Sequence, residues 1–293
     1  MTPAISIGMP VYNGADHLGQ ALESLLAQSC RNFEIIISDN ASSDTTSEII
    51  TEFAKRDARI RPVRQDENIG AVANFKCVLE LAKAPFFMWA AYDDWHDANY
   101  LEALLEALEK NPDAEMAVPR IIQKRKDGTV AEDTATPPMP DKTRIGRISR
   151  MLSLTRGGSI YGLYRTEPLR RAYARSLAGF PFVWAADHLI IFPFYVNDRV
   201  IGVPHTRFYN RDTGISVSRY RPETLREQWR FQCGFIRYAA NEVIQSRLKL
   251  WEKFICLLFL IKYSNAKAVK WRRLLRRLIM TPFASDPAAR KAP

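Results

Sequence analysis

Two adjacent carboxylates, Asp93 and Asp94, are the residues whose types and spacing most directly suggest chemistry. They follow the run Phe86–Ala91, which has the length and apolar character of a buried strand. One or two carboxylates, together with the phosphates of a substrate, form the usual oxygen ligand set of Mg²⁺ or Mn²⁺. The pair therefore predicts a divalent-metal site that holds a phosphorylated ligand.

Groups suited to ligand contact also follow the earlier expected strands, which are Ile5–Met9, Phe33–Ile37 and Ile60–Arg64. In chain order these groups are Pro10, Tyr12, Asn13, Asp39, Asn40, Ser42, Ser43, Asp44, Asn68, Ile69 and Gly70. Ligands of open α/β sheets bind at the edge where the carboxyl ends of parallel strands meet. We therefore expect these groups to gather with Asp93 and Asp94 at one edge.

The glycine-rich phosphate loops of the common nucleotide-binding enzymes are absent from the sequence. No GxGxxG follows the first strand, and no GxxxxGK[ST] occurs anywhere. These absences argue against dinucleotide-dependent dehydrogenases and P-loop enzymes. Phosphates held by carboxylates need a bridging cation, and we expect Mg²⁺ or Mn²⁺ there.

The elements that would position these residues alternate in the first part of the chain. Apolar residues recur at helical spacing in four segments, and a fifth strand is expected at Ala117–Gln123. The expected helices are Leu18–Leu26, Ser47–Ala54, Ala71–Ala82 and Tyr100–Lys110. This alternation predicts a Rossmann-like α/β fold, with a mainly parallel sheet flanked by helices on both faces.

The pattern is looser after residue 123. Lys126-Asp127-Gly128 predicts a hairpin turn, and the Pro-rich segment 133–142 predicts a mobile loop. The further expected elements are a strand at Ser159–Tyr164, helices near 167–177 and 186–197, a short strand at Val200–Val203 and helices from about 222 onward.

The order of these motifs resembles the family-2 inverting glycosyltransferases, which have the GT-A fold. The resemblance begins with ISIGMPVYNGADHLGQALESLLAQSCRNFEIIISDNASSDTTSEI, continues with ENIGAVANF, and includes FFMWAAYDDWHDANYL, which resembles the metal-binding DxD segment. It covers about residues 3–110 and extends more weakly to about 218. It implies a catalytic domain over 1–220, with a nucleotide-sugar half over about 1–115 and an acceptor half over about 116–220. A helical basic appendage, 221–293, follows.

The resemblance implies roles for the residues at the expected sheet edge. In the family, a tyrosine after the first strand packs against the nucleobase, an aspartate after the second strand bonds the base edge, and a second aspartate five residues later lies in the nucleoside pocket. The matching residues are Tyr12, Asp39 and Asp44. We place Pro10, Asn13 and Asn68 in the same donor-binding set.

The DxD segment departs from the family pattern at one position. Its first aspartate is replaced by Ala91, so the triplet is Ala91-Tyr92-Asp93, followed by Asp94. In the family the last aspartate of the triplet does most of the metal binding. The resemblance therefore implies that Asp93 is the principal metal ligand, with Asp94 supporting both metal and donor binding.

The second half of the chain supplies the expected base. VWAADHLIIF resembles the acidic block of the family before a helix, and Asp187 matches the general base. Inverting transfer needs such a base within hydrogen-bond reach of the acceptor hydroxyl. FYNRDTGISVS resembles a block that closes over the donor diphosphate. Arg211 matches its arginine, whereas the histidine often seen two residues later is Thr213 here.

Structural roles are the alternative for several of these residues. Asp39 and Asp44 fit the turn and N-cap of the helix that SSDTTSE begins, and Asp187 fits the N-cap of the helix that follows it. Tyr12 fits a packing role, and Arg211 fits a solvated or structural one. The sequence leaves both sets of roles open.

The composition fits a reduced protein with a substantial core. Of the 293 residues 47% are apolar, and the four cysteines show neither a disulfide framework nor a zinc-site spacing. The N-terminal residues lack the pattern of a secretory signal, and no apolar run approaches the roughly 20 residues of a membrane-spanning helix. We therefore expect a cytoplasmic protein.

The positive charge is concentrated in the C-terminal part. Residues 219–293 carry a net charge of +12, whereas the rest of the chain carries −2. One apolar helical face in this part consists of Trp251, Phe254, Leu257, Leu258 and Ile261. Together with the basic and apolar residues of 270–279, it resembles a helix on an anionic membrane surface, at the inner face of the cell membrane. The alternative is a terminal helix docked on the catalytic body with its basic face in water. Nucleic-acid binding is not expected, because no recognised motif accompanies the charge.

Together these features predict a metal-dependent inverting glycosyltransferase of the hexosyltransferase type. Its expected donor is a nucleotide sugar, with a UDP-sugar favoured, and its expected acceptor is a hydroxyl of a cell-surface glycan or a lipid-linked sugar. Two other classes remain open. Ala91 is compatible with a non-catalytic nucleotide-sugar-binding protein. A nucleotidyltransferase should carry a Gly-rich loop with Arg or Lys where this chain has PVYNGAD.

Overall fold

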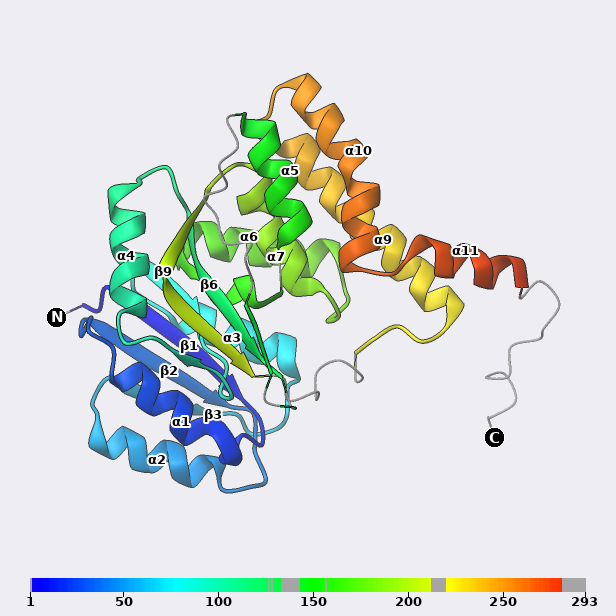
Figure 1. Cartoon of the computed structure of the whole chain (residues 1–293). Helices are drawn as coiled ribbons and strands as arrows, with labels where there is room; N and C mark the ends of the chain where they lie inside the picture. The colour runs from blue at the N-terminus through cyan, green and yellow to red at the C-terminus, as the bar shows by residue number, and fades with distance from the viewer. Residues whose placement is uncertain are drawn as a thin grey trace, which may run out of the picture.

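A mixed β-sheet carries helices on both of its faces (Figure 1). The computed structural model describes residues 2–125, 127, 129–132, 143–155, 157–211 and 220–280, without the side chains of 132 and 278–280. Within these residues, nine strands pair in the order β3-β2-β1-β4-β8-β6-β9-β5, and β7 pairs with β6. The strands are β1 Ile5–Val11, β2 Phe33–Asp39, β3 Ile60–Arg64, β4 Phe86–Trp89, β5 Trp95–His96, β6 Met116–Lys124, β7 Val130–Glu132, β8 Leu163–Arg165 and β9 Val200–Arg211.

The sheet contains two groups of parallel strands. β3, β2, β1 and β4 are parallel to one another, as are β6 and β9, and β8 lies antiparallel between β4 and β6. β4 and β6 therefore run in the same direction. The predicted α/β fold class is confirmed, with β8 as an antiparallel strand inside it.

Each face of the sheet has its own set of helices. α1, α2 and α4 pack on one face, against Ile5, Ile7 and Met9 of β1. α3, α5, α6 and α7 pack on the other. Gly8 lies under this second layer, where an added Cβ would be only 2.7 Å from the side chains of Val78 and Phe87. The helices are α1 Ala15–Leu26, α2 Thr46–Arg56, α3 Ala71–Leu81, α4 Tyr100–Lys110, α5 Arg144–Leu154, α6 Thr166–Gly179, α7 Ala186–Val196, α9 Leu225–Gln245, α10 Leu250–Lys267 and α11 Trp271–Met280, with the 3₁₀ helix η1 Gly157–Tyr161.

The C-terminal helices share the core of the second layer. Phe231 and Phe235 of α9, and Cys256 and Leu260 of α10, are buried in the same cluster as the side chains of α6 and α7. Figure 1 shows α10 beside α5 and α9, while α11 extends away from the sheet. The domain boundary at residue 220 stays a prediction.

Two predicted strands differ from the observed elements. Ser159–Tyr164 was expected to be one strand, but it forms the end of η1 and the start of β8. The chain turns at Gly162, which lies so close to Ala117 that an added Cβ would be 2.4 Å from the Ala117 carbonyl oxygen. β9 extends well beyond the predicted Val200–Val203, because its polar second half pairs with β5 and β6.

Neither α5 nor β5 was expected from the sequence. α5 is capped by Thr143, whose hydroxyl accepts the Gly146 backbone N–H (3.2 Å), and it buries Ile148, Met151 and Leu152. The helical spacing of these three residues could have predicted α5 from the sequence, whereas the two residues of β5 are too few to form a pattern. The predicted hairpin is present as the antiparallel pair of β6 and β7. The predicted loop 133–142 and Thr213 lie outside the described residues.

Candidate active site

The loops that follow β1 and β2 are joined by hydrogen bonds. The backbone N–H of Asn13 donates to Ser42 Oγ (2.9 Å), and that of Ser43 donates to Asn13 Oδ1 (2.9 Å). Asn13 has a positive φ of 50°, which asparagine tolerates better than most residues. Tyr12 beside it is 38% exposed, whereas Pro10 is buried in β1. The groups after β1 and β2 therefore do gather at one sheet edge.

Asp39 stabilises the loop after β2. Its side chain is almost completely buried and accepts the Ser42 backbone N–H (2.9 Å). Arg64, at the end of β3, forms an ion pair with the same carboxylate. Asp39 thus has a structural role in the loop, and its contact with a nucleobase stays a prediction.

Asp44 connects the starts of α1 and α2. Its carboxylate accepts the backbone N–H groups of Ala15 (3.2 Å) and Thr46 (3.1 Å), and the Thr46 hydroxyl (2.5 Å). Burial raises the pKa of Asp44, but these hydrogen bonds outweigh burial and hold the pKa below its usual value. The structure therefore shows the helix-start role, while the nucleoside contact stays a prediction.

Asn68 forms part of the turn that leads into α3. Its Oδ1 accepts from Asn40 Nδ2 (3.0 Å) and from the Gly70 backbone N–H (2.9 Å). Asn40 Oδ1 in turn accepts the Ile69 backbone N–H (2.9 Å). The segments after β2 and β3 are therefore held together, as the common sheet edge predicts.

Asp94 is the more buried member of the Asp93–Asp94 pair, with 2% exposure. Its carboxylate accepts the Arg211 backbone N–H (2.7 Å) and the Asn210 side-chain amide (3.1 Å). Burial, and after it the charge of Asp93, raises the pKa of Asp94 to about 7. Asp94 therefore fastens the end of β9 to the turn after β4, where Asp93 is partly exposed.

The chemistry of this pair suits a divalent cation. Burial, and after it the charge of Asp93, makes ionisation of Asp94 costly, and a nearby cation would relieve that cost. No group of three or more His, Cys, Asp or Glu side chains that could hold a metal occurs in the described part of the chain. Mg²⁺ and Mn²⁺ need only one or two carboxylates when phosphates complete the shell, so the pair fits a partial ligand set.

Arg211 borders the pair from the end of β9. Its Nε donates to the Asp93 backbone carbonyl (3.1 Å), and its guanidinium also donates to Gln20 Oε1 on α1 (2.6 Å). The guanidinium carbon lies 5.2 Å from the centroid of the Trp95 ring. These contacts place Arg211 beside Asp93, and its contact with a diphosphate stays a prediction.

Asp187 lies in the first turn of α7. Ala185 occupies the N-cap with a left-handed φ of 57°, and among the described residues no side chain caps this helix, so capping does not explain Asp187. The carboxylate faces Gly157 of η1, because a Cβ added to Gly157 would lie 2.3 Å from Asp187 Oδ2. Gly157 therefore provides the space that the carboxylate occupies.

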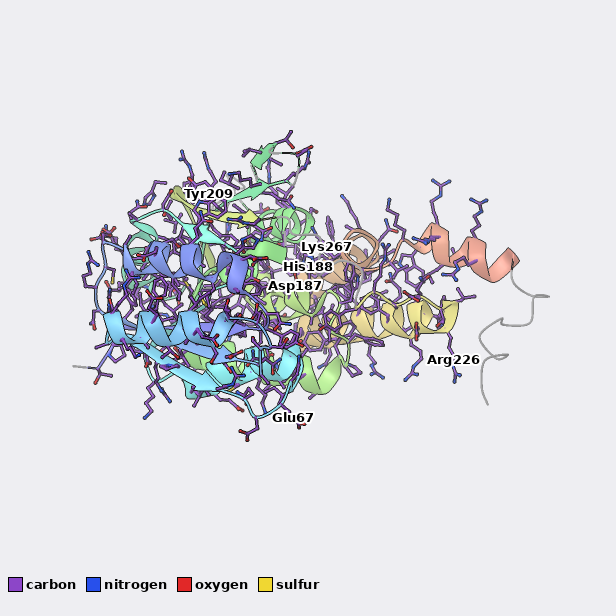
Figure 2. The ribbon with its side chains drawn as sticks, turned by 90° about the horizontal axis from the view of Figure 1, so that it is seen from below. Glu67, Asp187, His188, Tyr209, Arg226 and Lys267 are labelled. Carbon is purple, nitrogen blue, oxygen red and sulfur yellow. The ribbon has the colours of Figure 1, made fainter. Side chains whose placement is uncertain are left out.

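Two further residues adjoin Asp187: His188, which follows it in the chain, and Lys267 of α10, which was not predicted. Figure 2 shows His188 and Lys267 beside Asp187, near the junction with the C-terminal helices. The Lys267 ammonium donates to the backbone carbonyls of Ser153 (3.3 Å) and Thr155, which precede Gly157. Burial is the main cause that lowers the pKa of His188; Lys267 lowers it further and Asp187 opposes the shift. The C-terminal helices thus help to shape the surroundings of Asp187.

Tyr161 connects Asp187 with the Asp93–Asp94 pair. Burial raises the pKa of Tyr161 well above its usual value, and the charges of Asp94, Asp93 and Asp187 raise it further. The Tyr161 ring packs on Phe208 of β9, with ring centroids 5.1 Å apart, so η1 links Asp187 to the strand that ends beside the pair. Tyr161 was not predicted as a site residue, because its position depends on how η1 packs on the sheet.

Replacement of Gly157 by alanine tests the space beside Asp187. The new methyl group would displace the flexible carboxylate, so we expect any reaction that uses Asp187 to slow by about tenfold or more, with little change in the melting temperature. Gly158→Ala is the matched control, because a Cβ there meets its nearest atom at 3.5 Å, an ordinary contact distance. Equal activity of both variants with the wild type would contradict the arrangement.

Comparison with known proteins places the chain among glycosyltransferases. The family model described as "Glycosyl transferase family 2" matches residues 6–171. A putative glycosyltransferase EpsH of Bacillus subtilis is 37% identical over 105 residues, which are 36% of this chain and 30% of EpsH. Glycosyltransferase GlyG of Streptococcus pneumoniae is 30% identical over 118 residues, which are 40% of this chain and 39% of GlyG. The matches thus span only about a third of the length of these curated relatives.

Solved structures share the fold over most of the chain. S. aureus TarS 1–349 in complex with UDP-GlcNAc has a TM-score of 0.70 at 20% identity, covering 90% of this chain and 73% of that one. Mannosyltransferase PcManGT from Pyrobaculum calidifontis, in complex with GDP-Man and Mn²⁺, has a TM-score of 0.59 at 15% identity, covering 99% and 78%. At such identities these likenesses establish the fold alone. The family model matches more than half of the length of this chain, which therefore belongs to glycosyl transferase family 2.

Proposed function

We propose that the protein is a metal-dependent inverting glycosyltransferase that moves a sugar from a nucleotide sugar to an acceptor hydroxyl. The position of the Asp93–Asp94 pair carries this proposal. Asp94 is buried and accepts hydrogen bonds from Arg211 and Asn210, and the adjoining Tyr92 lies against Gly14 of the loop after β1. The pair therefore lies at the same sheet edge as the proposed donor contacts. Membership of glycosyl transferase family 2 supports the same reaction.

The proposed donor is a UDP-sugar. Structural relatives are described with UDP-GlcNAc, UDP or GDP-Man. In this proposal Tyr12 packs on the base and Asp39 bonds its edge. The other proposed donor contacts are Pro10, Asn13, Asp44, Asn68, Asp94 and Arg211.

In the proposed mechanism, Asp93 would hold Mg²⁺ or Mn²⁺ with help from Asp94. The bound ion would neutralise the charge that builds on the leaving nucleoside diphosphate. Asp187 accepts the proton of the acceptor hydroxyl while that oxygen attacks the anomeric carbon from the face opposite the leaving group. This geometry inverts the configuration of the transferred sugar.

Calorimetric titration with UDP, with and without Mn²⁺, tests the donor site. We expect UDP binding that depends on Mn²⁺, because two carboxylates repel a diphosphate unless a cation lies between them. Absence of metal-dependent binding would contradict the proposal and favour a non-catalytic protein. Release of a sugar 1-phosphate instead of UDP in a reaction with the UDP-sugar and acceptor would indicate transfer of the nucleotidyl group, and thus a nucleotidyltransferase.

The proposed acceptor is a cell-surface glycan or a lipid-linked sugar at the cytoplasmic face of the cell membrane. α10 supports membrane attachment, because its inner side packs in the core while Leu250, Trp251, Phe254, Leu258 and Ile261 are 54–85% exposed. At about 100° per residue these five side chains fall within about 100° of one another. We call them the α10 stripe. No helix in the described ranges is long and apolar enough to cross a bilayer.

Sedimentation with lipid vesicles tests the α10 stripe. Phe254→Asp should weaken binding to vesicles that contain anionic lipid by about tenfold, since transfer of one aromatic side chain out of water contributes about 1.5–3 kcal/mol. Val130→Asp is the matched control, because Val130 on β7 is 62% exposed and Phe254 is 64% exposed. Unchanged binding of the Phe254→Asp variant would contradict membrane attachment through α10.

A further inference from the structure

A pocket of about 370 Å³ lies between α3, α6 and the start of α7. Its walls are mostly aliphatic and aromatic, and include Val72 of α3, Ile160 of η1 and Leu177 of α6. Asp187 is the one charged residue among the described residues that line it. Mostly apolar pockets of this size with a few polar groups are the common form of small-ligand sites.

Several residues that line this pocket are fixed in place by contacts with neighbouring elements. The Tyr173 hydroxyl donates to the Val72 backbone carbonyl (2.9 Å) and thereby links α6 to α3. Phe180 and Phe182, in the connection between α6 and α7, pack against Phe231 of α9 with ring centroids 5.3 and 5.2 Å apart. A ligand would therefore enter a preformed space and would not have to order its walls.

The lining favours an apolar occupant over water. A buried water needs two to four polar partners, and the mostly aliphatic and aromatic walls offer few side-chain groups beyond the Asp187 carboxylate and the hydroxyls of Ser176 and Tyr173. The Tyr173 hydroxyl already donates to the Val72 backbone carbonyl, so its proton is less available to a water molecule in the pocket. An apolar group that binds in the pocket removes its own apolar surface and that of the walls from water, which is energetically favourable.

We propose that this pocket binds a hydrocarbon or aromatic group of the acceptor, close to its nucleophilic hydroxyl. The inference rests on the proposed role of Asp187 as the base. Asp187 lines the pocket, and its carboxylate faces Gly157 of η1. At the other end of η1, Tyr161 packs on Phe208 of β9, the strand that ends beside the Asp93–Asp94 pair. A hydroxyl that donates to Asp187 therefore places its neighbouring substituent against the apolar walls. The acceptor class is an amphiphile, such as a lipid-linked or aryl-linked sugar, and not a fully hydrated polymer.

Binding of two glucosides to the full chain tests this site. Octyl β-D-glucoside, kept below the concentration at which it forms micelles, should bind at least about tenfold more tightly than methyl β-D-glucoside, because only the octyl chain buries apolar surface. Val183→Glu adds a charge at the rim, where Val183 is 39% exposed. Ala71→Phe fills the volume from the start of α3. Each should weaken octyl glucoside binding at least about tenfold.

Two controls separate the pocket from other apolar surfaces. Val130→Glu repeats the Val183 substitution on β7, and Phe254→Asp disrupts the α10 stripe; both should bind octyl glucoside as the wild type does. Equal affinity for the two glucosides would overturn the proposal. Loss of binding in Phe254→Asp, with retention in both pocket variants, would also overturn it by locating the octyl chain on α10. Pocket binding without Mn²⁺-dependent UDP binding would support the pocket and refute the proposed function.

Discussion

Asp187→Asn should lower the rate of sugar transfer by about 10²–10⁴-fold, the usual contribution of a positioned general base. Asparagine has nearly the same shape as aspartate but cannot accept the proton of the acceptor hydroxyl. The side chain lies against Gly157 and does not cap α7, so its loss should change stability little. Steady-state kinetics with a UDP-sugar should show the loss in kcat, while UDP titration in Mn²⁺ stays unchanged.

Glu167→Gln is the matched control for this substitution. Glu167 lies in the first turn of α6, as Asp187 lies in the first turn of α7, and it pairs with Arg170 on the surface. The same change from carboxylate to amide at that position should leave transfer intact. A rate for Asp187→Asn within a few-fold of the wild type would exclude Asp187 as the base.

Asp93→Asn should weaken Mn²⁺-dependent UDP binding by about 100-fold or more, since even residues that only support a metal ligand contribute about 10–100-fold. Transfer should fall with it. Asp93 is partly exposed, whereas Asp94 is buried and accepts hydrogen bonds from Asn210 and Arg211. We therefore expect the unfolding free energy of the Asp93→Asn variant to stay close to that of the wild type.

Asp94→Asn is the contrasting variant. An asparagine at this position can still accept the Arg211 N–H, but it loses one of the two acceptor oxygens at the end of β9. The unfolding free energy should fall by about 1–3 kcal/mol, the usual cost of a broken buried hydrogen bond. Denaturant titration and UDP calorimetry of both variants separate these effects. If Asp93→Asn binds UDP as the wild type does in Mn²⁺, the metal does not lie at this pair.

The sheet edge could be predicted from the sequence because its features are local. Apolar runs of strand length and helical spacing located β1 to β4 and their helices, and the carboxyl ends of parallel strands always share an edge. The hydrogen bonds between Asn13 and Ser42, and between Asn40 and Asn68, follow from that rule. The resemblance to glycosyl transferase family 2 came from the same local segments and is confirmed by the family match.

Only the tertiary structure decided what surrounds Asp187. Gly157 of η1 lies against its carboxylate, and Lys267 of α10 donates to the backbone carbonyls of Ser153 and Thr155 just before η1. Both elements lie far from Asp187 in the chain, and no local pattern encodes such contacts. The same holds for the pocket beside Asp187, whose walls come from α3, α6 and α7. The sequence showed an apolar face on α10, but apolar residues occupy two sides of this helix. Only the packing of the chain decides which side faces the core. In the structure the other side, the α10 stripe, is exposed to water.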